Sequence, residues 1–182
     1  MNDPHFRLRA CTGETEWAVK QSGRAYTIAR PVLFMQNLIG MLREGAIHTA
    51  AGDGTGCDGR RSRRRRGHGR RADLPGCDGK TYTLTGPQVV SFDEVAEILS
   101  RETGKRIRHV RVAPDDVRNA LERSGVEAWF AEDMAKLHSM LSAGHQDLVT
   151  DDVRAVMGSS PCTLAEFGRD FAARFTGQHP GR

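Results

Sequence analysis

Lys80-Thr-Tyr-Thr-Leu84, followed by Gly86-Pro87 and Ser91-Phe-Asp-Glu94, sets the architecture of this chain. The first run holds β-branched and aromatic residues, which favour a strand, and the Gly-Pro pair ends it. Ser91 and Glu94 have the spacing of a capping box, in which each side chain accepts a hydrogen bond from the other residue's backbone N–H. The stretch therefore predicts a strand followed directly by a helix, the repeating unit of an α/β fold.

The same alternation continues on both sides of this stretch. Short β-prone runs at 25–30, 46–50 and 107–112 predict three further strands. Apolar residues at helical spacing, with glycine stops, predict helices between them. The expected helices cover residues 14–22, 33–45, 91–104, 114–125, 127–143 and a terminal segment that opens at a second capping box, Thr163-Leu-Ala-Glu166. We therefore expect an α/β protein with a helical C-terminal half.

The positive charge of the chain is local. The 182 residues carry a formal charge of +4, yet Thr55–Pro75 alone holds eight arginines and two aspartates and so exceeds that total. The rest of the chain is slightly acidic. Overall basicity is therefore no argument for a nucleic-acid partner of the whole protein.

Cysteine usage and hydropathy exclude several classes of protein. The four cysteines, Cys11, Cys57, Cys77 and Cys162, form no CxxC pair and no Cys/His ligand spacing. We expect no disulfide framework, no metal site and a reducing cytoplasmic location. No stretch approaches the roughly 20 apolar residues of a membrane span, and we expect no membrane partner.

The segment Thr55–Pro75 breaks the pattern of the chain around it. Gly54-Thr-Gly56-Cys-Asp-Gly59 matches the GxGxxG pattern, but arginines follow where a dinucleotide loop needs an amphipathic helix. We interpret the match as incidental. The arginine run that follows has three interpretations: a solvated loop without regular structure, a phosphate-binding polycation, or a stretch translated in the wrong frame.

The third interpretation follows from codon arithmetic. Arginine is usually encoded CGN, and a shift of one base turns CGN before C or T into a Val, Ala, Asp or Gly codon. The segment then becomes Val/Ala/Asp-rich, with the pattern of a strand followed by an apolar helix. We expect an internal frameshift at about residues 55–75.

Several segments in a fixed order resemble the NmrA-like atypical short-chain dehydrogenase family, including its NAD(P)H:quinone oxidoreductase-like members. The resemblance spans the chain apart from its first residues and Thr55–Pro75. The matching segments are Glu14-Thr-Glu16, Ser22-Gly23, Tyr26-Thr-Ile-Ala-Arg30-Pro31 with Phe34 and Asn37, Ala51-Gly-Asp-Gly54, Gly79-Lys-Thr-Tyr-Thr-Leu-Thr-Gly86-Pro87, Ser91 to Gly104 and Thr150 to Phe175.

The resemblance implies a fold and a set of domains. It implies the C-terminal part of a Rossmann-like NAD(P)-binding fold with a small, mostly helical substrate-side subdomain. We expect residues 1–54 to be a remnant of the Rossmann-like domain, 55–75 to be an anomalous, disordered Arg/Gly-rich segment and 76–182 to form a C-terminal α/β subdomain. The family's glycine-rich loop would lie upstream of Met1, so we expect a truncated chain that is inactive by itself.

The resemblance also implies a function and site residues. It implies that the intact relative is an NAD(P)H-dependent oxidoreductase acting on a quinone-like or carbonyl acceptor, with NADP or NAD as cofactor. Pro31 and Phe34 match positions near the nicotinamide, and Asn37 matches a position near the substrate pocket. No catalytic acid or base is evident. A redox-sensing regulatory protein with a protein partner and no turnover is the alternative, and nucleic-acid binding through the arginine run is the third hypothesis.

Overall fold

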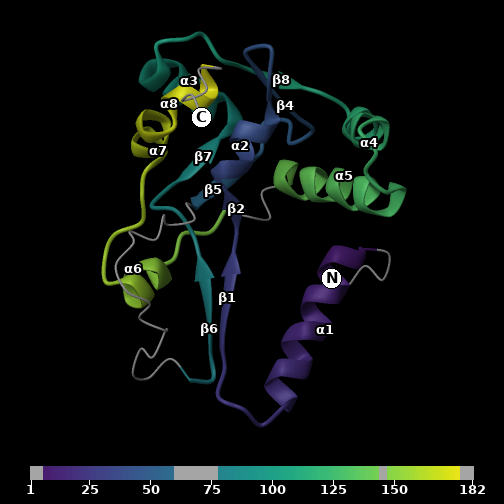
Figure 1. The fold of residues 1–182 in the computed structure, drawn as a ribbon, viewed down its shortest axis with the longest axis vertical. Helices are drawn as coiled ribbons and strands as arrows, with labels where there is room; N and C mark the ends of the chain where they lie inside the picture. The colour runs from purple at the N-terminus through teal and green to yellow at the C-terminus, as the bar shows by residue number, and fades with distance from the viewer. Residues whose placement is uncertain (1–5, 60–77, 144–146, 177–182) are drawn as a thin grey trace, which may run out of the picture.

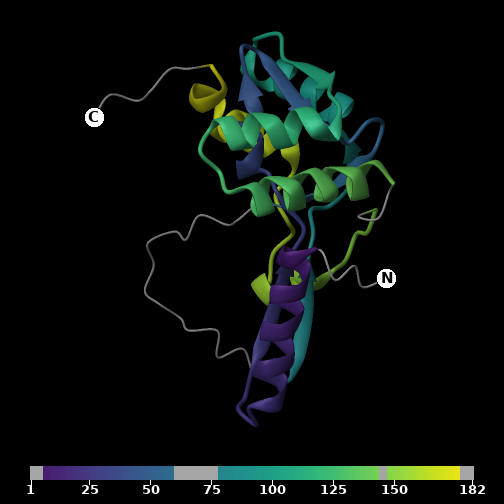
Figure 2. The ribbon, with the colours of Figure 1, turned by 90° about the vertical axis from the view of Figure 1, so that its right-hand side faces the viewer.

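The computed structural model describes residues 6–59, 78–143 and 147–176 (Figure 1). The first helix, α1 (Arg7–Gln21), runs beside a parallel pair of strands, β1 (Thr27–Pro31) and β6 (Lys80–Leu84). The Arg30 side chain on β1 donates to the Glu16 carboxylate on α1, with a distance of 2.7 Å from Nε to Oε1. These elements belong to the lower part of the molecule in both ribbon views (Figure 2). The expected strands at the centre of this unit are confirmed.

Two further small sheets form the upper part. One has the order β2-β5-β7, in which β5 (Thr55–Gly59) pairs in parallel with β2 (Leu33–Phe34) and antiparallel with β7 (Val89–Ser91). The other has the order β3-β4-β8, with β4 (Ala46–Thr49) between β3 (Leu42–Arg43) and β8 (Arg108–Arg111). The pairing of β4 with β8 is parallel. Strands alternating with helices make the protein α/β, as predicted.

Both predicted capping boxes are confirmed. The Ser91 hydroxyl accepts from the Glu94 N–H at the start of α3 (Phe92–Thr103), and the Glu94 carboxylate accepts from the Ser91 N–H at 2.7 Å. Thr163 and Glu166 make the same exchange at α7 (Leu164–Asp170). The short helix α8 (Ala172–Phe175) follows, and both C-terminal helices contact α3. Their buried apolar faces close the core.

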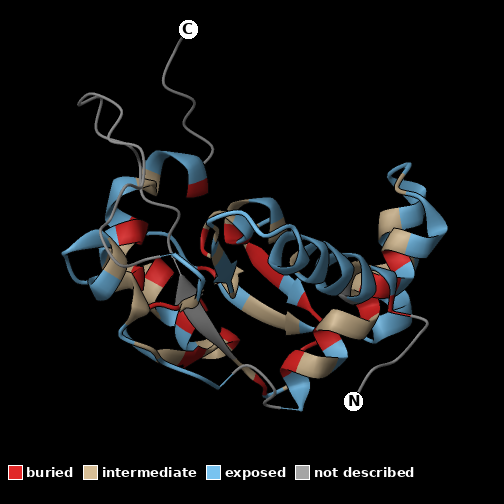
Figure 3. Ribbon diagram, turned by 90° about the horizontal axis from the view of Figure 1, so that it is seen from below, coloured by how far each residue is buried: buried red, intermediate tan, exposed pale blue. Residues whose placement is uncertain are grey.

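The core joins the upper sheets to α3, α7 and α8. Phe167 lies at its centre, with ring centroids 4.6 Å from Phe171 and 5.9 Å from Phe175. Figure 3 shows that buried residues gather where strands and helices meet, while the outer turns are exposed. The buried core residues include Met35, Leu38, Ile47, Phe92, Leu99 and Leu164.

Helices α4 (Pro114–Arg123) and α5 (Ala128–Ser142) pack against each other on one side of the upper part (Figure 1). The N-terminus of α1 contacts α5, where the Leu8 N–H donates to the buried Asp133 carboxylate at 2.8 Å. An anion at this position satisfies a helix N–H that has no partner within the helix. A last helix, α6 (Asp152–Met157), contacts β6.

The structure corrects the expected helix over residues 33–45. Residues 33–34 form β2, α2 covers Gln36–Met41, and Leu42 leaves the helix with an extended backbone (φ −75°, ψ 122°). A turn with positive φ at Glu44 and Gly45 then leads into β4. The single-helix prediction was wrong because β2 and β3 pair with β5 and β4, and these ladders override the local apolar spacing.

The segment expected to be anomalous begins with regular structure, because its first five residues form β5. The frameshift and the disorder were predicted for residues 55–75; from residue 60 onward that segment, with its arginine run, lies outside the described residues. In the ranges that the structure describes, no helix is long and apolar enough to cross a membrane.

Candidate functional site

A cavity of about 780 Å³ lies between α2, α4 and α5, and we call it the α4–α5 pocket. The two helices contribute most of its apolar wall. These residues are Val117, Ala120 and Leu121 from α4 and Phe130, Met134 and Leu137 from α5. Leu33 on β2, Met41 at the end of α2 and Phe92 at the start of α3 add to the apolar lining. The volume falls within the range of small-molecule sites, roughly 300–1,000 Å³.

The pocket forms because α4 and α5 present apolar stripes that the core does not absorb. Pro114 begins α4, and the Asp116 carboxylate accepts from the Ala113 N–H at 3.2 Å, which fixes the start of this helix. Within the described residues of α4 no side chain is buried, although Val117 and Leu121 are half-buried. The apolar side of α4 therefore faces a cavity, and an apolar ligand would complete its burial.

His138 is the most buried polar side chain in the lining of the pocket. It is 7% exposed and lies on α5, one turn from Leu141 and one turn from Met134. The Ala50 N–H donates to its Nδ1 at 3.1 Å. Burial lowers the pKa of His138 below its usual value, so the imidazole is neutral near pH 7. An accepting Nδ1 in a neutral ring leaves the proton on Nε2.

The other polar residues in the lining are more exposed than His138. Asn37 is exposed in the first turn of α2, His48 is exposed on β4, and Asp116 and Arg123 are exposed on α4. Asp116 already accepts from the Ala113 N–H. The pocket thus combines an apolar wall, one buried imidazole and a set of exposed polar groups, which suits an apolar ligand with few polar atoms.

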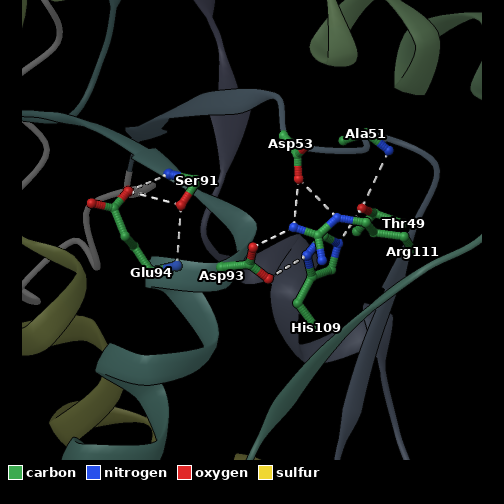
Figure 4. A network of polar contacts seen from close by, with 8 residues as sticks. All are labelled: Thr49, Ala51, Asp53, Ser91, Asp93, Glu94, His109 and Arg111. Atoms are coloured by element: carbon green, nitrogen blue, oxygen red, sulfur yellow. Dashed lines mark hydrogen bonds and ion pairs between the residues drawn. The ribbon is translucent and has the colours of Figure 1, made fainter.

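A polar network beside the pocket holds β4, β8 and α3 together (Figure 4). His109 on β8 contacts the Asp93 carboxylate through Nδ1 at 3.0 Å and the Thr49 hydroxyl through Nε2 at 2.8 Å. Because a carboxylate only accepts, Nδ1 is the donor. The hydrogen bond from His109, then that from Arg111, lowers the pKa of Asp93. The Arg111 guanidinium also donates to Asp53 at 2.6 Å.

This Thr–His–Asp arrangement is structural. The Thr49 side chain is fully buried and its oxygen already accepts from the Ala51 N–H at 3.3 Å, so no substrate can reach it. The network instead fixes residues 50–53, the segment whose Ala50 N–H orients His138. It therefore positions the one buried imidazole of the pocket lining.

Gly54 fixes the distance between this segment and α5. A Cβ atom at Gly54 would lie 2.2 Å from the backbone oxygen of Leu141 and 2.6 Å from the Cα of Ser142. Only glycine permits such an approach between two backbones. The carboxyl end of α5, which carries His138 and Leu141 into the pocket lining, is thereby seated against residues 50–54.

The three residues predicted from the resemblance lie on one continuous segment. Asn37 lines the α4–α5 pocket. Pro31 is exposed at the carboxyl end of β1, where it pairs with Leu84. Phe34 is half-buried in β2 and pairs with Gly59. Pro31 and Phe34 are outside the pocket lining, two residues before and one residue after Leu33, which is part of it.

The GxGxxG match forms a strand. Residues 55–59 are β5, the middle strand of its sheet, and their backbone pairs with β7 and β2. Backbone N–H groups in a ladder cannot also cradle phosphates. The interpretation of the match as incidental agrees with this geometry.

Sequence reasoning missed His138 as a pocket residue. The stripe of Phe130, Met134, Leu137 and Leu141 on α5 is evident from spacing alone, but that spacing is equally typical of core packing. His138 lies four residues after Met134 and three before Leu141, so the same spacing places it on this face. Among the described residues, no cluster of His, Cys, Asp or Glu could hold a metal ion.

Comparison with known proteins gives several relatives. No family model matches the chain. The chain is 34% identical over 159 residues to an uncharacterized oxidoreductase, YesF, of Bacillus subtilis (strain 168). The aligned region covers 83% of this chain and 55% of that relative. The chain is 30% identical over 189 residues to an NAD(P)H azoreductase of Xenophilus azovorans, which covers 95% of this chain and 62% of that protein. The chain thus spans little more than half the length of these relatives.

Solved structures support the same fold. Triphenylmethane reductase of Citrobacter sp., in complex with NADP(H), has a TM-score of 0.65 and 29% identity, covering 87% of this chain and 57% of that one. An NADPH-dependent quinone oxidoreductase of Escherichia coli matches with a TM-score of 0.71 at 23% identity, and the matched region covers 87% of this chain and 59% of that protein. At this identity the match supports the fold alone. The predicted fold class, part of a Rossmann-like NAD(P)-binding fold, is confirmed.

Proposed function

Since this chain is a relative of the NAD(P)-dependent oxidoreductases of the NmrA-like and quinone reductase class, we propose that it contributes the acceptor site to the reduction of a quinone-like or carbonyl acceptor by NADPH or NADH. The α4–α5 pocket holds the acceptor in this proposal. The observation that carries it is an apolar cavity of about 780 Å³ with a buried imidazole in its lining. Quinones and aromatic carbonyl compounds are flat and largely apolar, with few polar atoms to satisfy.

The lining suits a flat ring. Phe130 and Leu121 offer an aromatic and an aliphatic surface from two adjacent helices. Burying apolar area contributes about 25 cal/mol per Å², so a ring between these side chains gains affinity from its faces without any charged contact. Met134 adds a flexible, polarisable side chain that adapts to different ring outlines. These properties favour a class of acceptors over one particular compound.

In this proposal the described residues hold one end of a nicotinamide dinucleotide. Pro31 ends β1 and Phe34 follows in β2, so both lie near the carboxyl end of a parallel strand, the position where α/β sheets bind ligands. We assign the nicotinamide to this place and Asn37 to the rim between it and the acceptor. When bound, the cofactor supplies the hydride. In the ranges 6–59, 78–143 and 147–176, no glycine-rich loop opens a helix, so these residues supply no cradle for the pyrophosphate.

Equilibrium dialysis of the 182-residue chain with menadione tests the acceptor site. We expect saturable binding that Val117→Phe weakens at least about tenfold, because the larger side chain occupies the apolar cavity. Val19→Phe makes the same change on the exposed surface of α1 and is the matched control. Binding that Val117→Phe leaves unchanged, or no binding by the wild-type chain, would contradict the proposal.

A further inference from the structure

His138 has a hydrogen-bond donor that the described part of the protein leaves unused. Its Nδ1 accepts from the Ala50 N–H, and its Nε2 has no partner among residues 6–59, 78–143 and 147–176. His138 is more than nine-tenths buried and is one of the residues that line the α4–α5 pocket. The Nδ1 lone pair and the Nε2–H bond point in widely divergent directions in the imidazole plane, so the Nε2–H does not point at the backbone of Ala50.

The donor is fixed in both identity and direction. Nδ1 is occupied as an acceptor, which leaves the proton of the neutral ring on Nε2. Residues 50–53, which orient the ring, are themselves held by Arg111, Asp53 and the buried Thr49. A rigid donor at an apolar wall favours a ligand with an acceptor atom at one place, because a buried donor without a partner is destabilising.

We infer that His138 Nε2–H donates a hydrogen bond to a carbonyl oxygen of the acceptor and that His138 thereby determines specificity in the α4–α5 pocket. The pocket then selects flat apolar molecules that carry a ring carbonyl over hydrocarbons of the same shape. This inference rests on the proposed function, since it specifies the substrate class of the same site. A neutral donor also suits an uncharged oxygen, which a cationic group in an apolar site would bind only with a larger desolvation cost.

The exposed polar groups in the lining cannot take this role equally well. Arg123 and Asn37 are open to water, which competes for their hydrogen bonds. Asp116 accepts hydrogen bonds and does not donate when ionised. His48 is exposed on β4 and is the second imidazole in the lining. Of the donors in the described lining, His138 alone is withdrawn from solvent.

The test compares two ligands of the same skeleton, menadione and the methylnaphthalene without its two carbonyl groups. Their dissociation constants are measured by equilibrium dialysis with the wild-type chain, His138→Phe and His138→Gln. The ratio of the two constants isolates the carbonyl contribution, because the hydrocarbon reports any general change in the pocket. We expect His138→Phe to reduce the preference for menadione about fivefold. Glutamine keeps an N–H donor at a similar reach, so His138→Gln should restore part of the preference.

Each outcome has a distinct meaning. If the wild-type chain binds neither ligand, the proposed function fails. If it binds both and His138→Phe keeps the full preference for menadione, the pocket stands and the role of His138 is overturned. If His138→Phe does not fold, the ¹⁵N resonance of His138 Nε2 in the wild-type chain tests whether this nitrogen donates to the ligand carbonyl. Menadione should shift that resonance and the hydrocarbon should not, and equal responses to both ligands would overturn the inference.

Discussion

Gly54→Ala should displace the end of α5 and thereby distort the α4–α5 pocket, although Gly54 itself is not part of the pocket lining. The new methyl carbon would lie 2.2 Å from the Leu141 carbonyl oxygen, where ordinary contacts begin at about 3.4 Å. The end of α5 must therefore move by about 1.2 Å, and the obstacle is backbone, which cannot rotate away. Overpacking usually costs about 1–3 kcal/mol, and we expect the upper end of that range. For a chain of 182 residues this lowers Tm by about 6–12 °C.

The assay is thermal unfolding together with menadione binding. Gly13→Ala is the control, because Gly13 lies inside α1 with nothing within 4 Å of the position that an alanine methyl group would take. Alanine favours a helix interior over glycine by up to about 1 kcal/mol, so this variant should be as stable as the wild type or more so. Menadione binding should weaken only in Gly54→Ala, since its displacement reaches His138 and Leu141. If the Gly54→Ala variant is as stable as the Gly13→Ala variant, the close approach of Gly54 to Leu141 does not fix the position of α5, which contradicts this prediction.

Three further predictions concern the caps, the titration of the buried imidazole and the cofactor. Ser91→Ala removes a helix cap and should cost about 1 kcal/mol in urea unfolding, whereas Ser159→Ala at an exposed bend should cost nothing measurable. Burial lowers the pKa of His138 in the folded state, so as the pH falls below about 6.5 the unfolded chain binds the additional proton first and the stability of the folded state declines. The stability of the His138→Gln variant should therefore decline less than that of the wild type between pH about 7.5 and about 5.5. Titration of NADPH into this chain should give no saturable signal at micromolar concentrations, since the GxGxxG residues form β5; a micromolar dissociation constant would contradict this.

Local signals in the sequence predicted local structure well. The capping boxes at Ser91 and Thr163 depend on residues three apart, so they are evident without any tertiary information. The strands at 46–49 and 80–84 have β-prone composition and clear stops. The prediction for 33–45 failed because its structure depends on partners far along the chain, such as the pairing of Leu33 with Asp58. No local pattern contains that information.

The candidate site was only partly accessible from sequence. The apolar stripe of α5 was found, but an apolar face against a cavity has the same spacing as one against a core. Asn37 was expected near a substrate pocket; it lies in the lining of the α4–α5 pocket, which we propose as the acceptor site. The role of His138 needed the contact between Ala50 and His138, which joins residues 88 positions apart. Gly54 was noticed as part of a motif, but its packing against Leu141 could not be foreseen.

A crystal structure of the chain grown with menadione is the decisive measurement for the acceptor site. We expect the quinone between α4 and α5, with its ring against Phe130 and Leu121 and one carbonyl oxygen within hydrogen-bond distance of His138 Nε2. Menadione bound at another surface, with the α4–α5 pocket filled by the protein's own side chains, would contradict this assignment.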